Sequence, residues 1–180
     1  MTEAFPSREQ ALHLLRQSGC SRDVIRHSEK VAELAVKIAE ACWKNGIDVD
    51  LKLVEIGALL HDIGRSKTHN VHHVIAGAKI AESLGLPKPI VSIIKRHVGA
   101  GISEDEAERL GWPNDVYMPQ TLEEKIVSYA DKRIEGLRIV PIQRTIQRFR
   151  SKGLPHSTLK RLKGLAREMK DLVGDCKSIL

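Results

Sequence analysis

Helical patterning runs through the whole of the 180-residue sequence and limits the fold more than any other feature. Apolar residues recur at steps of three and four, and glycines end several of these runs. Three runs begin with a capping-box pattern: Ser7 with Gln10, Ser103 with Glu106, and Thr121 with Glu124. Alternating β-branched stretches joined by hairpin turns are absent, and aromatic residues make up only 3% of the chain. The sequence therefore predicts an all-α fold without a sheet.

The caps and glycines also predict where the helices lie. The expected helices cover residues 7–19, 21–46, 50–64, 73–85, 89–99, a short stretch from 103, 121–140, a stretch from 141, and an amphipathic last stretch from 157. The last helix has Leu159, Leu162, Ala166, Met169 and Val173 in line, a stripe that could pack within the chain or against a second subunit. Between residues 99 and 120 a segment rich in Pro, Gly and Asn could form a lid.

Composition narrows the class of protein. Apolar residues make up 42% and charged residues 29%, near the averages for soluble globular domains, and the apolar runs are too short to cross a bilayer. The first ten residues lack the features of a signal peptide, so we expect a cytoplasmic protein without a membrane partner. Cys20, Cys42 and Cys176 form no CxxC pair and are expected to be inert.

The positive charge is concentrated near the carboxyl end. Residues 132–180 hold 13 lysines and arginines against 4 acidic residues, within a net charge of +6 for the whole chain. Such a basic segment could bind nucleic acid, although a solvated helix face is the more common explanation. The few aromatic residues argue against a base-stacking platform for single strands.

Metal-capable side chains stand where the helical pattern calls for apolar ones. On the second expected helix, His27 falls in one stripe with Val24 and Val31. The full set of such residues, one on each of five expected helices, is His27, His61, His73, His97 and Asp131. Each alone could be satisfied by a backbone carbonyl or, for the aspartate, by a cation. Together they would need five separate compensations, whereas one metal centre would satisfy all of them, so we favour a metal centre.

Asp62 extends this set because it follows His61 directly. Its two oxygens could bridge two ions, which dinuclear hydrolases hold about 3.5 to 4 Å apart. The other histidines, His13, His69, His72 and His156, are expected to lie on the surface.

The order of these elements resembles a known family. His27, HDIG at 61–64, HVIAGA at 73–78, RHVGAG at 96–101 and YADK at 129–132 are similar to the motifs of the HD-domain phosphohydrolase superfamily, HDIG subgroup. Within this superfamily the chain looks most like small archaeal HDIG proteins and bacterial diadenosine tetraphosphate hydrolases of HD type. The resemblance implies a single-domain helical bundle, with an N-terminal helix at 1–20 packed on the core, the HD domain at 21–140, and a basic helical extension at 141–180 within the same domain.

The resemblance also implies the ligands. It places His27, His61, Asp62 and Asp131 around a first divalent metal, and His73 and His97, with Asp62 bridging, around a second. Many relatives have a doubled histidine where this chain has His97 and Val98, so the second ion would have more water among its ligands. Fe, Mn, Co, Ni and Zn all suit these ligands.

Such a site can hydrolyse phosphate compounds. Two cations that share a water lower its pKa to about 7, which supplies hydroxide at neutral pH. We expect Asp62 and His61 to be catalytic. Four basic residues next to the ligands could contact phosphate, namely Arg65, Lys67, Arg96 and Lys132. Of these we favour Lys132 and Lys67. Trp112 or Tyr117 could stack on a base, although packing on the core is the more common role.

Three functions follow as hypotheses. The first is a metal-dependent phosphohydrolase that cleaves a phosphoester or phosphoanhydride of a small nucleotide or dinucleotide. The second is a diiron oxygenase of the same superfamily, which would contain iron and consume oxygen. The third is a nucleic-acid or partner-binding module with a structural metal, which would bind with a steep salt dependence and show no turnover.

Overall fold

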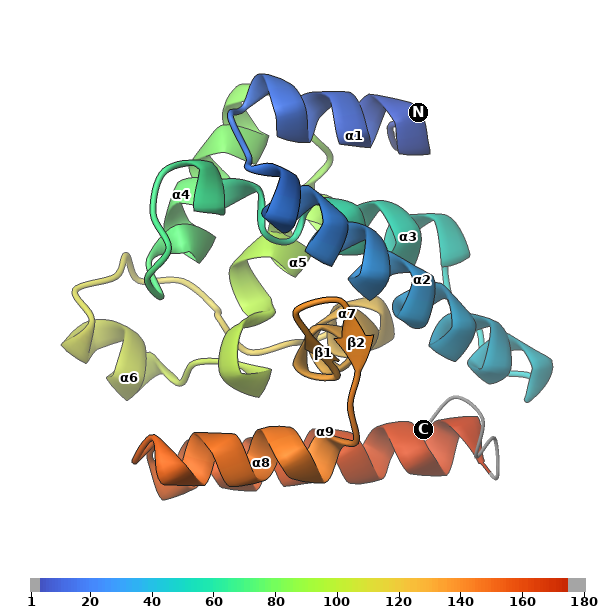
Figure 1. The fold of residues 1–180 in the computed structure, drawn as a ribbon, viewed down its shortest axis with the longest axis vertical. Helices are drawn as coiled ribbons and strands as arrows, with labels where there is room; N and C mark the ends of the chain where they lie inside the picture. The colour runs from blue at the N-terminus through green and yellow to red at the C-terminus, as the bar shows by residue number, and fades with distance from the viewer. Residues whose placement is uncertain (1–3, 175–180) are drawn as a thin grey trace.

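The computed structural model describes residues 4–174, and the regular secondary structure of these residues is almost entirely helical (Figure 1). The elements are α1 Arg8–Gln17, α2 Arg22–Lys44, α3 Leu51–Leu60, the 3-10 helix η1 Ile63–Ser66, α4 His73–Ser83, α5 Lys88–Arg96, the 3-10 helix η2 Val98–Ala100, α6 Glu104–Arg109, α7 Leu122–Lys132, β1 Ile134–Glu135, β2 Arg138–Ile139, α8 Ile142–Ser151 and α9 His156–Val173. The all-α prediction is confirmed. Cys176 lies outside the described residues.

The predicted helix starts are built as the sequence indicates. The Ser7 side chain accepts a hydrogen bond from the Gln10 backbone N–H at 3.1 Å, and the Gln10 side chain accepts one from the Ser7 N–H at 2.7 Å. Reciprocal capping boxes also open α6 at Ser103 and α7 at Thr121. These caps satisfy backbone donors that have no partner within the helix, so each fixes where its helix begins.

Two predicted helices are wrong at their ends. The helix expected over 50–64 stops at Leu60 and is followed by the separate 3-10 helix η1. The helix expected over 121–140 stops at Lys132, and the chain then forms a two-stranded antiparallel hairpin in which Ile134 pairs with Ile139. Gly136 makes the turn with φ of +61°, a conformation that glycine adopts without steric cost. Arg133 donates to the Val140 carbonyl and closes the base of the hairpin. The expectation of no sheet is therefore corrected by two strands of two residues each among the described residues.

Helix α2 forms the centre of the bundle and packs against α3 and α7, while α1 lies on α3. Helices α8 and α9 pack together along one side, below α7 in the view of Figure 1. The apolar stripe of α9 is buried there, with Leu162 and Met169 fully inaccessible. Because this stripe is covered within the chain, it gives no support to a homo-oligomer, which stays a prediction.

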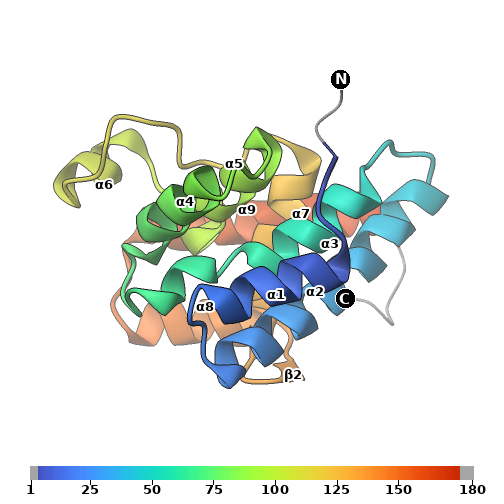
Figure 2. The ribbon, with the colours of Figure 1, turned by 90° about the horizontal axis from the view of Figure 1, so that it is seen from above.

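Helix α6 and the loops around it stand at one end of the molecule (Figure 2). Here Val74 of α4 packs with Ala107, Trp112 and Tyr117 in a small apolar group that we call the satellite cluster. Trp112 and Tyr117 are only 7% and 3% exposed, and their rings meet edge to face at 4.8 Å. The packing role is therefore confirmed for both aromatics, and neither presents its ring for a nucleobase to stack on.

The described helices include none that combines the length and the apolar character needed to cross a membrane.

Candidate metal centre

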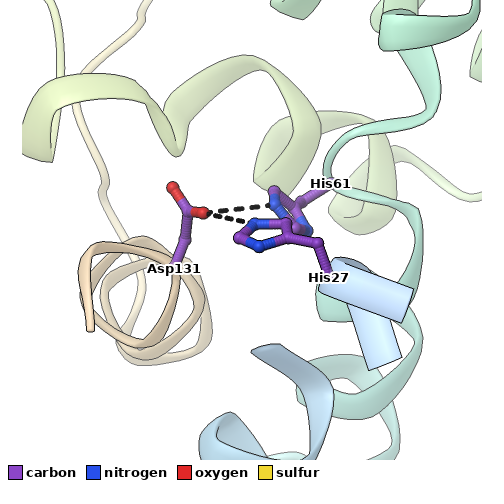
Figure 3. Close-up of side chains that lie close together, drawn as sticks. All are labelled: His27, His61 and Asp131. Carbon is purple, nitrogen blue, oxygen red and sulfur yellow. Dashed lines mark hydrogen bonds and ion pairs between the residues drawn. The ribbon is translucent and has the colours of Figure 1, made fainter. Parts of the chain in front are cut away.

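Three predicted ligands from distant parts of the chain meet between α2, the end of α3 and α7 (Figure 3). His27 Nε2 lies 3.0 Å from Asp131 Oδ1, and His61 Nε2 lies 3.5 Å from the same oxygen. His61 is fully buried, whereas the His27 side chain is 21% exposed at the mouth of the site. The two imidazoles and the carboxylate thus converge on one small volume that solvent reaches from the side of His27.

Asp62 lies between this group and a second one. Its Oδ2 is 3.5 Å from His61 Nε2 and 4.0 Å from His27 Nε2. Its Oδ1 is 3.1 Å from His73 Nε2 and 3.5 Å from His97 Nε2. Each oxygen therefore faces a different pair of imidazoles, which is the arrangement that a carboxylate bridging two cations requires.

The orientation of the three buried imidazoles is fixed by backbone carbonyls. The Nδ1–H groups of His61, His73 and His97 donate to the carbonyls three residues earlier, at 2.6, 2.7 and 2.9 Å. A carbonyl can only accept, so each Nδ1 carries the proton and each Nε2 presents a lone pair to the interior of the site. Metal-binding histidines are commonly held in this way.

Several of these inward atoms lack partners within the chain. His61 Nε2 and Asp62 Oδ1 are buried and make no hydrogen bond. The Nε2 atoms of His73 and His97 lie 3.1 Å apart. With both Nδ1 atoms protonated, two lone pairs face each other there, which is unfavourable unless a cation or a proton lies near them.

The pKa shifts of His97 and Asp131 suit a bound cation, whereas for His61 the carboxylates of Asp62 and Asp131 outweigh burial and raise the pKa. Burial lowers the pKa of His97 to about 3, so this imidazole is neutral at physiological pH. Burial alone would raise the pKa of Asp131, but Lys132 and the imidazoles of His27 and His61 lower it well below its usual range. A neutral imidazole and an ionised carboxylate are the forms that bind metal.

The spacing of the donor atoms also fits. Two ligands about 2.0 to 2.2 Å from a shared cation, at about 90 to 110° to each other, lie about 2.8 to 3.6 Å apart. Most of the contacts above fall in this range, from 3.0 to 3.5 Å. Two sets, His27 with His61 and Asp131, and His61 with Asp62 and His97, bring their ligand atoms within 4.8 Å of one another.

Two glycines allow the segment that carries His61 and Asp62 to lie close to the start of α4, which carries His73. A Cβ on Gly64 would lie 1.9 Å from the His73 carbonyl oxygen and 2.5 Å from the Gly77 backbone nitrogen. The backbone of η1 can therefore pack directly on the first turns of α4 only because both positions lack side chains. This contact brings His61 and Asp62 next to His73.

Two basic side chains hold the carboxylates of Asp62 and Asp131 in place. Arg65 Nε donates to Asp62 Oδ2 at 2.6 Å. Lys132, only 8% exposed, donates to Asp131 Oδ2 and, at 3.3 Å, to the His97 carbonyl. Lys132 thus leaves Asp131 Oδ1 turned towards His27 and His61, and it ties α7 to the end of α5.

The cluster opens into a cavity of about 530 Å³. Its lining includes the ligand candidates His27, Asp62 and Asp131 together with Ser21, Asp23, Val24, Arg65, His69, Lys132, Ile134, Arg148 and Phe149. Of the four basic residues considered as phosphate contacts, the structure brings Arg65 and Lys132 to this cavity, and Lys132 is one of the two that were favoured. Lys67 is exposed and outside the lining, and Arg96 pairs instead with Glu124 at 2.7 Å. Residues 99–120, the predicted lid, contribute nothing to this lining.

Sequence reasoning missed Arg148 and Phe149. Both belong to the basic extension, and their phase on α8 relative to the ligands cannot be read without the packing of α8. His69 was predicted to lie on the surface; it is exposed but also lines the cavity. His13, His72 and His156 are exposed, as predicted.

The described cysteines fit the expectation of inert thiols. Burial raises the pKa of the Cys20 thiol to about 11, with a smaller contribution from the nearby Asp62 carboxylate. Burial also raises the pKa of Cys42. Both thiols therefore stay protonated at neutral pH.

The model of one protein family, the HD domain, matches residues 24–134, more than half of the chain. The chain belongs to the HD domain family. This confirms the resemblance to the metal-dependent phosphohydrolase superfamily, whereas membership of the HDIG subgroup stays a prediction.

Several known proteins are similar to most of this chain. An uncharacterized protein of Methanocaldococcus jannaschii is 43% identical over 166 residues, which cover 92% of this chain and 98% of that protein. A tRNA (cytidine(56)-2′-O)-methyltransferase of Picrophilus torridus is 38% identical over 97% of this chain, which spans only 49% of the length of that enzyme. The HD domain of the L. monocytogenes phosphodiesterase PgpH, solved in complex with cyclic-di-AMP, has the same fold, with a TM-score of 0.54 and 20% identity over 94% of this chain and 96% of that one.

Proposed function

We propose that this HD domain is a metal-dependent hydrolase that cleaves a phosphoester or phosphoanhydride bond of a nucleotide or dinucleotide. The observation that carries the proposal is the position of Asp62, whose two oxygens face different pairs of imidazoles beside an open cavity. A PgpH HD domain of the same fold is described with a cyclic dinucleotide bound, which supports a nucleotide as substrate here.

The ligand set is proposed in two halves. His27, His61, Asp62 and Asp131 would hold one divalent cation, and His73, His97 and Asp62 a second. When bound, such cations would activate water and neutralise charge on the phosphoryl oxygens. The absence of a second histidine after His97 would leave coordination positions of the second cation to water or substrate.

The other residues of the site act on the ligands. Arg65 holds Asp62 Oδ2, and Lys132 holds Asp131 Oδ2, so both carboxylates keep their orientation without substrate. Because Arg65 and Lys132 are each paired with a carboxylate that would bind metal, we assign both side chains to positioning. Lys132 also lines the cavity and is close enough to contact a phosphoryl oxygen. The prediction that Lys67 contacts phosphate has no such support.

A substrate screen tests the proposal. Purified protein loaded separately with Mn, Fe, Co, Ni or Zn is assayed for release of phosphate or nucleotide from phosphomonoesters, cyclic nucleotides and dinucleoside polyphosphates. We expect turnover that a chelator removes, that metal restores, and that Asp62→Ala lacks. Oxygen consumption by the iron form without phosphate release would instead favour the diiron oxygenase.

A second candidate is hydrolysis or binding of RNA. Lysines and arginines line the exposed surface of α8 and α9, including Arg144, Arg150, Lys160, Lys163 and Arg167. A relative that contains a matching segment is named a tRNA methyltransferase, which supports a role near RNA. Binding of a transcribed tRNA, measured at several salt concentrations, would show a steep negative slope of affinity against salt if several of these residues contact phosphates. A flat slope would reject this candidate.

A further inference from the structure

Arg148 lies in the wall of the same cavity but comes from a different part of the chain. It belongs to α8 of the basic extension, beyond residues 24–134 that match the HD family. It lines the cavity together with His27, Asp62 and Asp131. The extension therefore contributes a cation to a site whose metal-ligand candidates all lie within the family segment.

The basic side chains that line this cavity differ in their ion-pair partners. Arg65 is bound to Asp62 and Lys132 to Asp131, so both neutralise carboxylates of the metal cluster. Among the arginines and lysines that line the cavity within residues 4–174, Arg148 alone has its ion pair elsewhere. Its Nη1 lies 3.1 Å from Glu135 Oε1, in the hairpin.

The guanidinium is held but not saturated. Glu135 fixes one side of it, and its centre lies 5.9 Å from the centroid of the Phe149 ring. Its Nε is buried and makes no hydrogen bond. The Arg148 side chain as a whole is 39% exposed, so the outer nitrogens of its guanidinium can still donate to acceptor oxygens of a ligand in the cavity.

We propose that Arg148 binds a second, non-reacting phosphoryl group of the substrate and so selects substrates that carry at least two phosphoryl groups. This inference rests on the proposed function for the identity of the reacting group. Metal ions in the cluster would neutralise the reacting phosphoryl group. Arg148 is paired with Glu135 and with none of the metal-ligand candidates, so the rest of its guanidinium is available to another anion. The planar fork of arginine suits two oxygens of one phosphate.

The other walls fit the same kind of substrate. Val24, Ile134 and Phe149 give the cavity an apolar side next to Arg148. An apolar side beside a phosphate contact suits the nucleoside part of a nucleoside diphosphate or dinucleotide.

Arg144 supplies a matched control. It lies one helical turn before Arg148 and pairs with the other oxygen of Glu135, Oε2, at 2.8 Å. Its side chain is 67% exposed, and it does not line the cavity. Arg144→Gln therefore removes one basic charge and one Glu135 pair without changing the cavity wall.

The test uses two compounds whose P–C bonds cannot be hydrolysed. Methylenebisphosphonate carries two phosphonate groups and methylphosphonate carries one, and the affinity of metal-loaded protein for each is measured by calorimetry. We expect Arg148→Gln to weaken binding of the bisphosphonate by about 10-fold to 100-fold and of methylphosphonate by less than about threefold. Arg148→Lys should fall between Arg148→Gln and the unmodified protein, and Arg144→Gln should change either affinity by less than about twofold.

Three results would overturn the inference. Arg148→Gln could change the bisphosphonate affinity as little as Arg144→Gln does. It could also weaken binding of both compounds equally, which would indicate contact with the reacting phosphoryl group or a structural role. If circular dichroism shows that Arg148→Gln does not fold, Arg148→Lys decides, and unchanged bisphosphonate affinity in that variant rejects the role of the guanidinium.

The same protein separates this inference from the proposed function. If the unmodified protein hydrolyses substrates of the screen while Arg148→Gln behaves as Arg144→Gln, the inference fails and the hydrolase stands. If no substrate is hydrolysed with any metal, yet the preference for the bisphosphonate is lost in Arg148→Gln, the hydrolase fails and the binding role stands.

Discussion

His73 and Val74 are consecutive residues at the start of α4, but they enter two different interiors. His73 joins the polar cluster around Asp62, whereas Val74 joins the satellite cluster with Trp112 and Tyr117. The satellite cluster is complete within the chain, since the Trp112 Nε1–H donates to His72 Nδ1 at 2.9 Å and the Tyr117 hydroxyl donates to the Pro113 carbonyl at 2.9 Å. The polar cluster keeps buried atoms without partners.

This difference separates packing from function. An apolar group is stabilised by burial itself, and its few polar atoms find partners nearby. Convergent lone pairs and carboxylates gain nothing from burial, so their persistence next to a cavity requires a compensating cation. Metal should therefore affect the polar cluster strongly and the satellite cluster little. Four substitutions test how far the parts of the molecule depend on metal and on packing, in order of decreasing expected effect.

Asp62→Ala should cause the greatest loss, because it removes the contact between both groups of imidazoles. We expect bound metal to fall close to zero by elemental analysis and turnover to fall by more than about 100-fold. Asp48→Ala, which removes an exposed aspartate, is the control and should change neither quantity. Normal metal content in Asp62→Ala would reject the bridging role.

Trp112→Ala tests the other interior. Removing a large buried side chain should lower the free energy of unfolding by about 3 kcal/mol, measured by urea denaturation, while metal content stays unchanged. Trp43→Ala removes a side chain that is 62% exposed and should change stability by less than about 0.5 kcal/mol. Loss of metal in Trp112→Ala would mean that the two clusters depend on each other.

His97→Ala divides the polar cluster itself. His97 faces Asp62 Oδ1, whereas His27 faces Oδ2 and Asp131, so the two alanine variants should affect different cations. We expect His97→Ala to weaken the second cation by about 10-fold to 100-fold and to spare the first, with the reverse result for His27→Ala. Metal stoichiometry that does not change in His97→Ala would contradict a dinuclear site.

Glu106 gives the weakest effect, on the link between α6 and α9. Burial raises its pKa, but hydrogen bonds from the Ser103 backbone, Arg161 and Ser157 outweigh burial and lower the pKa below its usual value of 4.5. This stabilisation is present above about pH 4.5 and is lost as the pH falls through the lower pKa of the folded state.

Glu106→Gln should therefore be less stable than the unmodified protein at pH 7 by about 1 kcal/mol, and the gap should narrow as the pH falls below 4.5. Urea denaturation at a series of pH values measures the gap. Taking the difference between the two proteins cancels the titration of the metal cluster, and a constant gap would show that the ion pair with Arg161 does not stabilise the fold.

Much of the fold could be predicted because its signals are local. The capping boxes at Ser7, Ser103 and Thr121 fix helix starts through contacts three residues apart, and the structure contains all three. The end of α7 at Lys132 was not predicted, because the hairpin that follows is held by the pairing of Ile134 with Ile139 and by the contact of Arg133 with Val140.

The candidate site divides in the same way. A polar residue in an apolar stripe is visible in the sequence, so helical periodicity singles out five of the residues that converge, namely His27, His61, His73, His97 and Asp131. Asp62 was added to them because it follows His61 directly. Which cations reach the cavity depends on how helices pack. Arg65 and Lys132 lie there, whereas Lys67 faces solvent and Arg96 is bound to Glu124.

The helical class, the helix starts and the side chains that burial would leave without partners all follow from the order of residues alone, because each depends on periodicity or on neighbours a few residues away. Only the packing of the helices establishes that each oxygen of Asp62 faces a different pair of imidazoles and that Arg148 of the extension shares their cavity. These facts depend on the close contact of Gly64 with α4 and on the hairpin that sets the position of α8, and such long-range contacts leave no local pattern.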